Sequence, residues 1–356
     1  MTLSYAVIGT GAIGGYYGGR LAESGCDVHF LLRSDYEHTQ HHGLVVDSVD
    51  GDFVLPKVNA YAHPTEMPSV DVVIVALKTT QNHQLMELLP PLKPESAILL
   101  LQNGLEVEAA VEKLLTEKLN KDNLATAPTI CGGLCFICAN KVGPGHIQHS
   151  DYGRVLLGAH SSVLKPLMPS PLLKAITVDF NRAKVETDIT NDLPMARWQK
   201  LVWNVPYNGL SVVLDATTTE LMASSDVKAL IATLMHEVVA VANAWGEKIM
   251  EEAKLADAED NSSERDGLER YDVDIDGLDG YERALSTDLV EMMLEHTETM
   301  ASYLTSMKLD FDRQRPLEIE SILGVPLQVA ETLGVLVPAM TMLYQQLVFL
   351  NARNVG

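Results

Sequence analysis

A glycine-rich turn directly after the first predicted strand constrains this chain more than any other feature. The apolar run 5–8 breaks at once into Gly9-Thr10-Gly11-Ala12-Ile13-Gly14. Glycines at this spacing permit a tight strand-to-helix turn, leave backbone bare for a pyrophosphate, and let the helix pack closely on the strand. A glycine-rich turn alone is weak support, but an apolar helix over 16–24 and a second strand over 27–32 follow it. This order predicts a β-α-β unit that binds a dinucleotide.

An arginine follows the second predicted strand, where NAD-binding chains carry an acid. Asp or Glu at that place binds the ribose 2′-hydroxyl, whereas an arginine suits a 2′-phosphate. This chain has Arg33, and Asp35 lies too far along to replace the missing acid. Arg33 therefore predicts NADP(H). The alternative is that Arg33 is a solvated side chain at a strand end.

Net charge and hydropathy exclude several classes of partner. The chain has 356 residues, of which 47% are hydrophobic, so two buried cores are possible. A formal net charge of -22 disfavours nucleic acid and anionic membranes, because both require clustered positive charge. The N-terminus enters a strand without a basic region, and we expect neither a signal peptide nor a membrane span. The expected location is cytoplasmic.

Three clusters of possible metal ligands have simpler explanations. Three of the four cysteines fall in an apolar segment, where free cysteine is a common buried residue: Cys131, Cys135 and Cys138. Four residues open like a calcium-binding EF-hand loop: Asp272, Asp274, Asp276 and Gly277. The glutamate that would complete this loop is replaced by Arg283, so a solvated acidic loop is the alternative. The histidines form a surface run: His38, His41 and His42. We therefore predict no metal site.

The first half of the chain alternates strands with helices. A strand over 70–77, a helix over 82–89 and a strand over 97–101 follow the first β-α-β unit, which predicts a parallel, doubly wound, Rossmann-like sheet. Short strands over 132–139, 145–149 and 154–157 are typical of an antiparallel meander that extends or edges this sheet.

The second half of the chain has long helical patterns instead. They cover 196–214, 227–253, 287–307 and 338–352. We therefore predict a Rossmann-like domain over 1–190 and an all-helical substrate-binding domain over 191–356. Fourteen acidic and four basic residues lie between Glu247 and Glu282, which predicts an exposed acidic insertion around 253–285.

One face of the first helix in the second half carries polar groups that suit catalysis. Lys200, Asn204 and Asn208 recur every four residues, between apolar neighbours. Such groups are costly to bury without partners. A desolvated lysine can protonate a carbonyl oxygen during its reduction, and asparagine amides can orient a hydroxyl or carboxylate. A solvated helix face is the alternative, which Pro206 within the helix makes less suitable.

In combination, these motifs resemble the ketopantoate reductase family, the 2-dehydropantoate 2-reductases. The glycine-rich turn and the Lys-Asn-Asn face carry the resemblance, and further signatures follow in order. These are Lys78-Thr79, Gln102-Asn103-Gly104, Ser306-Met307, Asp310, Arg315-Pro316 and Glu318-Ile319. The resemblance extends from Tyr5 to about Pro338.

The resemblance implies a role for each matching residue of the substrate site. Lys200 would be the general acid, and Glu318 would hold Lys200 or the substrate hydroxyl. Ser306 would bind the substrate carboxylate, and Asn204 and Asn208 would position the keto acid.

For the cofactor, the resemblance implies contacts of Arg33 and Lys78 with the phosphates of NADPH. Gln81 would lie near the cofactor, and Asn103 would lie between the nicotinamide and the substrate. The expected partner is a small 2-keto acid, and a homodimer is implied by resemblance alone.

Two alternatives to ketopantoate reduction remain open at this point. The family includes reductases of other branched or aryl 2-keto acids, and Tyr303, just before Ser306, could reshape the acyl pocket. A non-catalytic NADPH-binding protein is the second alternative. Retention of Lys200 with Glu318 argues against it, because a binding module needs no acid.

Overall fold

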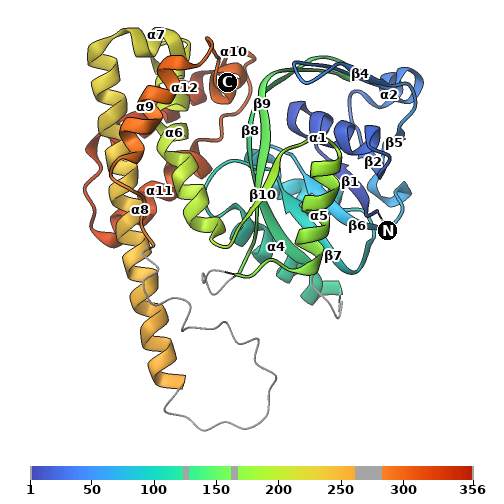
Figure 1. Cartoon of the computed structure of the whole chain (residues 1–356), viewed down its shortest axis with the longest axis horizontal. Helices are drawn as coiled ribbons and strands as arrows, with labels where there is room; N and C mark the ends of the chain where they lie inside the picture. Colours follow the sequence, from blue (N-terminus) through green and yellow to red (C-terminus); the bar gives the residue numbers. More distant parts are fainter. Residues whose placement is uncertain (1, 123–127, 162–166, 261–282, 355–356) are drawn as a thin grey trace. The chain divides into compact units, whose positions relative to one another are not determined.

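The computed structural model of the chain describes residues 2–122, 128–161, 167–260 and 283–354. They form two compact units, one containing the residues up to 161 together with 168–193 and the other beginning at Pro194. Figure 1 shows the strands of the first unit in blue and green, and helices α7 to α12 of the second in yellow to red. Most of the predicted acidic insertion, including its Asp272 to Gly277 run, lies outside the described residues.

A single mixed sheet forms the centre of the first unit. Its strands are β1 (Ser4–Ile8), β2 (Asp27–Leu31), β3 (Leu44–Ser48), β4 (Phe53–Leu55), β5 (Asn59–Tyr61), β6 (Val70–Val75), β7 (Leu92–Leu100), β8 (Thr129–Gly143), β9 (His146–Ala159) and β10 (Thr187–Thr190). Their order is β4-β3-β9-β8-β7-β6-β1-β2-β5, and β10 pairs with β9. The segment from β5 to β8 is parallel throughout. It has the strand order of a Rossmann fold, which confirms the predicted fold class.

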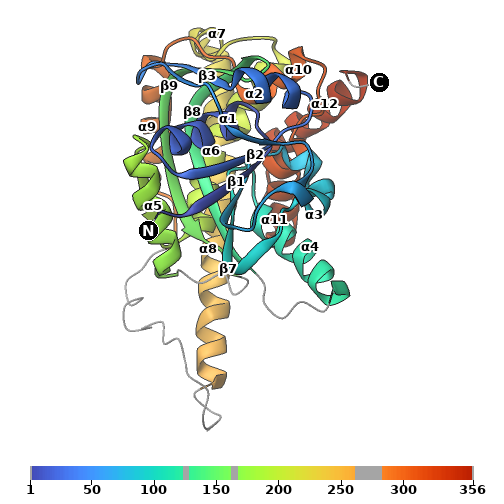
Figure 2. The same cartoon turned by 90° about the vertical axis from the view of Figure 1, so that its right-hand side faces the viewer.

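Helices cover both faces of this sheet, as Figures 1 and 2 show. The helices of this unit are α1 (Ala12–Glu23), α2 (Tyr36–His42), η1 (Pro64–Glu66), η2 (Thr79–Gln84), α3 (Leu85–Leu88), α4 (Val107–Asp122) and α5 (Pro171–Arg182). Alternate residues of β1 enter separate cores. Tyr5 and Val7 pack with α1 and α5, whereas Ala6 and Ile8 pack with α3 and α4. This alternation is the two-residue period of a strand buried on both faces.

The predicted meander is instead one long antiparallel hairpin of β8 and β9. The two short strands predicted over 145–149 and 154–157 are joined in β9. The pairing register shifts near Tyr152 and Gly153, whose φ angles are 60° and 128°. A β-bulge thus occupies the place where the sequence indicated a turn. The hairpin lies inside the sheet, because β3 pairs with the other side of β9.

The second unit is helical in its described residues. Its helices are α6 (Leu193–Val213), α7 (Thr218–Ala223), α8 (Ser225–Asp260), α9 (Leu289–Thr299), α10 (Ser306–Asp312), the π-helix η4 (Glu320–Gly324), α11 (Val325–Leu333) and α12 (Pro338–Asn354). Helices α7, α9, α11 and α12 all contact α8. The single helix predicted over 287–307 is wrong: α9 ends at Thr299, and the Thr305 side chain caps a new helix, α10.

Helix α8 is long and apolar enough over Ser225–Leu255 to cross a membrane, by length and composition only. Ile231, Leu234, Val238 and Ala242 on this helix are buried within the helical unit. They recur every three to four residues, which is the pattern of a core helix in a globular domain.

Candidate active site

The glycine-rich turn has the geometry that pyrophosphate binding requires. Gly9 has a φ of 93°, which favours glycine. A Cβ on Gly14 would lie 2.4 Å from the carbonyl oxygen of Gly9, so helix α1 packs on the turn only because this side chain is absent. A Cβ on Gly11 would meet no atom within 4 Å. Bare backbone at Gly11 therefore faces open space at the start of α1, where helix N–H groups attract anions.

The turn lies at the point where the strand order reverses. Strand β1 is flanked by β2 on one side and β6 on the other, both parallel to it. The carboxyl ends of β1 and β6 lead into Gly9 and Lys78, respectively. In open α/β sheets, ligands bind outside the carboxyl ends of strands at such a reversal. These residues thus fit a dinucleotide phosphate site.

Arg33 and Asp35, which both follow β2, differ in their exposure to solvent and in their partners. Arg33 is exposed, whereas Asp35 is buried. Asp35 accepts a hydrogen bond from the backbone N–H of Gly145, at 3.0 Å, and forms an ion pair with Lys141. Burial alone would raise the pKa of Asp35, but the hydrogen bonds from Lys141 and Gly145 outweigh burial and hold it below its usual range. Asp35 is therefore engaged within the sheet unit.

A pair of amide side chains joins the loops that follow β6 and β7. Gln102 is buried, and its Nε2 donates to the carbonyl oxygen of Leu77 and to Oδ1 of Asn82, each at 2.7 Å. The Nδ2 of Asn82 donates back to Gln102 Oε1 at 3.3 Å. This pair fixes the backbone beside Lys78 and the half-buried Asn103. The sequence predicts no role for Gln102 or Asn82, although the Gln102-Asn103-Gly104 run is a signal for Gln102.

The predicted polar face lies on α6 in the helical unit. Asn204 and Asn208 are buried, and Lys200 is partly buried. Pro206 is accommodated within the continuous helix and is also buried. The interpretation as a solvated helix face is therefore wrong for the two asparagines.

Asn208 connects this face to Ser306. The Asn208 Oδ1 accepts the backbone N–H of Met307 at 3.2 Å and lies 3.4 Å from Ser306 Oγ. A second link lies beside it, because Ser211 Oγ and Thr305 Oγ1 are 2.7 Å apart. The structure thus brings together Asn208 and Ser306, two residues that are far apart in sequence.

A buried lysine supports the same segment through ion pairs with two exposed carboxylates. Lys308 is 5% exposed, and its Nζ lies 2.8 Å from Oδ1 of Asp215, two residues after the end of α6; it also pairs with Asp312. Burial would lower the pKa of Lys308, but the two carboxylates outweigh it and raise the pKa. Lys308 therefore remains charged and ties α10 to the residues that follow α6.

Glu318 lies two residues before the π-helix η4 and is buried. Short π-helical segments are rare and occur frequently at functional sites. The sequence does not predict this segment, because a π-helix leaves no periodic signal of its own.

The possible metal ligands do not assemble in the part of the chain that the structure describes. That part holds no group of three or more His, Cys, Asp or Glu side chains able to bind a metal ion. Burial, and then the nearby Glu108, raise the pKa of the Cys131 thiol to about 12. A thiol with such a pKa is a poor metal ligand and nucleophile.

Both halves of the chain match models of one known protein family. Residues 5–162 match the model of ketopantoate reductase PanE/ApbA, and residues 192–351 match the model of its C-terminal domain. The chain belongs to the ketopantoate reductase family. This confirms the resemblance inferred from the motifs.

Relatives with the same family name are similar along their whole length. The 2-dehydropantoate 2-reductase of Nostoc sp. is 44% identical over 351 residues, which cover 98% of this chain and 96% of that protein. A crystal structure of 2-dehydropantoate 2-reductase from Geobacter metallireducens GS-15 has a TM-score of 0.79 and 36% identity, covering 98% of this chain and 99% of that one.

D-mandelate dehydrogenase, solved with NADH and anilino(oxo)acetate, shares the fold with a TM-score of 0.74, 19% identity and 99% coverage of both chains.

Proposed function

We propose that this member of the ketopantoate reductase family reduces 2-dehydropantoate to pantoate with NADPH, as a step in pantothenate and coenzyme A synthesis in the cytoplasm. The observation that carries the proposal is the junction of Asn208 with the Ser306 segment, on a helix that also presents Lys200 and Asn204. Identity of 44% with a 2-dehydropantoate 2-reductase, along nearly the whole chain, supports the same substrate.

The reaction needs a hydride, a proton and a fixed substrate. NADPH would supply the hydride to the keto carbon. Lys200 would give its proton to the carbonyl oxygen as negative charge develops there, and Glu318 would orient Lys200 or the substrate hydroxyl. The Ser306 hydroxyl would donate to the substrate carboxylate, and the amide of Asn204 would orient the keto acid.

Asn208 has a more specific role in this proposal. Its Oδ1 already holds Met307 and approaches Ser306, so only its Nδ2 would be directed to the substrate.

The sheet unit would hold the cofactor. Residues 9–14 would bind the pyrophosphate through backbone N–H groups, and Lys78 would add positive charge beside it. Arg33 would pair with the 2′-phosphate, since Asp35 is engaged elsewhere. Gln81 and Asn103 would lie near the cofactor, and Asn103 would separate the nicotinamide from the substrate. Domains over 1–190 and 191–356 would thus provide cofactor and substrate halves.

Self-association is part of the proposal. A ketopantoate reductase from Staphylococcus aureus, with 18% identity and a TM-score of 0.67, is described as dimeric. We propose a homodimer for this chain as well.

A reductase of aryl 2-keto acids is the second candidate. Tyr303 is half-buried three residues before Ser306, and it exchanges two hydrogen bonds with Thr218. Both hydrogen bonds involve the Tyr303 backbone and hold that backbone in place. An aromatic side chain at this place suits an aryl substrate, such as that of the D-mandelate dehydrogenases with the same fold.

The deciding experiment is NADPH oxidation with 2-dehydropantoate, 2-ketoisovalerate and benzoylformate, each repeated with NADH. The highest kcat/KM is expected for 2-dehydropantoate with NADPH. A preference for benzoylformate would establish the second candidate. Lys200→Ala should lower kcat by about two to four orders of magnitude while NADPH still binds. The matched control is Lys248→Ala, which removes an exposed lysine of the same unit. If none of the substrates is turned over, the alternative of a non-catalytic NADPH-binding protein would be favoured.

The cofactor assignment has its own test in Arg33→Asp. This change should weaken NADPH binding by about ten- to a hundredfold, the value of a charge-assisted hydrogen bond, and leave NADH binding nearly unchanged. Equal affinity of the unmodified protein for both cofactors would contradict the role given to Arg33.

A further inference from the structure

Asn351 is a polar residue at an inward position of helix α12. Met340, Leu343 and Leu347 of this helix are nearly inaccessible to solvent and belong to the interior of the helical unit. The same spacing of three to four residues reaches Asn351 next, where an apolar side chain would be expected. Asn351 is partly buried, and a polar group at such a place is costly unless it has a partner.

The partner of Asn351 is the backbone beside Glu318. The Oδ1 of Asn351 accepts the N–H of Leu317 at 3.1 Å, across 34 positions of the sequence. Leu317 is buried, and it lies in the irregular segment 315–318, between α10 and the helical turn that begins at Ile319. A buried N–H outside a helix or strand needs an acceptor from another part of the chain, and Asn351 provides it.

The chain on the other side of Glu318 is held to the same helix. The Tyr344 hydroxyl donates to Glu320 Oε1 at 2.8 Å. Tyr344 and Asn351 are about two turns apart, so they lie on one face of α12. A Cβ on Gly324 would collide with the second carboxylate oxygen of Glu320, so this carboxylate fits only against a glycine. The residues before and after Glu318 are thus both attached to α12.

We propose that Asn351 is a positioning residue of the reductase site, which sets the place of the Glu318 carboxylate through the N–H of Leu317. Consecutive Cα atoms are about 3.8 Å apart, so an anchor at Leu317 leaves little freedom to the Cα of Glu318. A displacement of about 1 Å at a reacting group can lower the rate about a hundredfold. The inference rests on the proposed role of Glu318 in orienting Lys200 or the substrate hydroxyl, and adds the residue that fixes Glu318.

Steady-state kinetics of Asn351→Leu test this role. Leucine has nearly the same size as asparagine but no acceptor, so the Leu317 N–H loses its partner. The kcat with 2-dehydropantoate and NADPH should fall about ten- to a hundredfold, whereas the Kd of NADPH should stay unchanged. Asn351→Asp keeps an acceptor oxygen at the same place and should keep most of the wild-type kcat.

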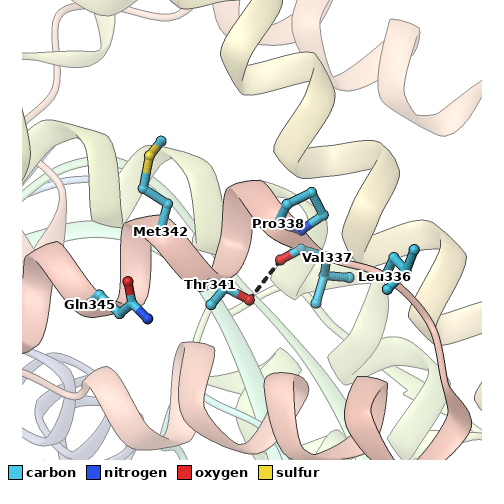
Figure 3. Close-up of a pocket in the computed structure, with 6 residues that line it drawn as sticks. All are labelled: Leu336, Val337, Pro338, Thr341, Met342 and Gln345. Carbon is cyan, nitrogen blue, oxygen red and sulfur yellow. Dashed lines mark hydrogen bonds between the residues drawn. The ribbon is translucent and has the colours of Figure 1, made fainter.

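Gln345→Leu is the matched control, because it makes the same amide-to-leucine change on the same helix. Gln345 is exposed and lines an open groove at the N-terminal half of α12, away from segment 315–318. The groove is lined by Leu336, Val337, Pro338, Thr341, Met342 and Gln345 (Figure 3). The kcat of this variant should equal that of the wild type. Circular dichroism confirms that each variant is folded at the assay temperature.

A double-mutant cycle separates positioning from general support of the fold. Glu318→Gln removes the carboxylate that Asn351 is proposed to position, and should lower kcat by itself. In that background Asn351→Leu should lower kcat much less than in the wild type, because the two changes affect one interaction. Equal fold-losses in the two backgrounds would show that Asn351 supports only the fold.

The outcomes separate this inference from the proposed function. A wild type without turnover, or a Glu318→Gln variant as active as the wild type, would overturn the proposed role of Glu318 and this inference with it. A slow Glu318→Gln variant beside an Asn351→Leu variant with wild-type kcat would overturn the inference alone.

Discussion

The side-chain oxygen of Asn208 on α6 accepts the backbone N–H of Met307 in the first turn of α10, at 3.2 Å. Both groups are buried, so this hydrogen bond fixes the position of Ser306 relative to α6. Asn208, which is predicted to position the substrate, therefore also positions a second predicted substrate ligand, Ser306.

Two substitutions of Asn208 should separate these roles. Asn208→Leu leaves the buried Met307 N–H without an acceptor and should cost about 1–3 kcal/mol in the free energy of unfolding. Asn208→Asp keeps the acceptor and should cost less, yet it loses the Nδ2 donor and adds a negative charge that repels an anionic substrate. The KM for the keto acid should therefore rise in both variants, whereas only Asn208→Leu should lose most of that stability. Equal stability of the two variants would contradict the supporting role.

The glycine-rich turn offers a matched pair of substitutions. Gly14→Ala places a methyl group 2.4 Å from the Gly9 carbonyl oxygen and should destabilise the sheet unit by about 1–3 kcal/mol. Gly11→Ala meets no protein atom and should leave stability unchanged while weakening NADPH binding. Thermal unfolding followed by circular dichroism, together with cofactor titration, measures both. Unimpaired cofactor binding by Gly11→Ala would show that the phosphates do not approach this residue.

His149 should make the stability of the sheet unit depend on pH. Ser48 Oγ accepts from Arg20 Nη2 and from the backbone N–H of Asp50, so its own proton points to His149 Nδ1 at 2.8 Å. The neutral ring, protonated on Nε2, then donates to two backbone carbonyl oxygens. Burial lowers the pKa of His149, although the carboxylate of Asp50 acts in the opposite direction.

A histidine in the unfolded chain has a pKa of about 6.5. Just below this pH, His149 is therefore protonated in the unfolded chain but still neutral in the folded chain. The contribution of His149 to stability is therefore present above about pH 6.5 and is lost as the pH falls toward the lower folded value. The midpoint of thermal unfolding should decrease more between about pH 7.5 and 5.5 in the wild type than in His149→Gln. Parallel pH profiles would refute this assignment.

Helix α12 depends on a carboxylate from α8 for its N-terminus. The two carboxylate oxygens of Glu237 accept the backbone N–H groups of Ala339 and Met340, at 3.0 and 2.8 Å. Glu237→Ala should cost about 1–2 kcal/mol, and Glu237→Gln less, because the amide keeps one acceptor.

Tryptophan fluorescence in urea can measure this loss selectively. All three tryptophans, at 198, 203 and 245, lie in the helical unit. An unchanged unfolding midpoint for Glu237→Ala would indicate that the cap contributes little.

Local patterns in the sequence predict the features of the fold that depend on neighbouring residues. The spacing of Gly9, Gly11 and Gly14 predicts a turn whose three glycines serve three distinct steric purposes in the structure. The four-residue spacing of Asn204 and Asn208 predicts a shared helix face, and both lie buried on α6.

Features that depend on distant residues were not predictable in this way. The bulge at Tyr152 and Gly153 has the composition of a turn, and only pairing with β8 keeps it within a strand. The hydrogen bond between Asn208 and Met307 joins residues 99 positions apart, so no local pattern reports it. The break before Thr305 interrupts an apolar pattern that by itself would continue as a helix.

The engagement of Asp35 limits how the cofactor preference of this chain can change. Releasing its carboxylate would leave the Gly145 amide without its acceptor and Lys141 without its counter-charge. An acidic residue that binds the ribose hydroxyls must therefore be introduced in the exposed segment after β2, because Asp35, two residues after Arg33, cannot take this role. Starting from the proposed preference for NADPH, a change toward NADH would begin at Arg33 and leave the β8–β9 hairpin intact.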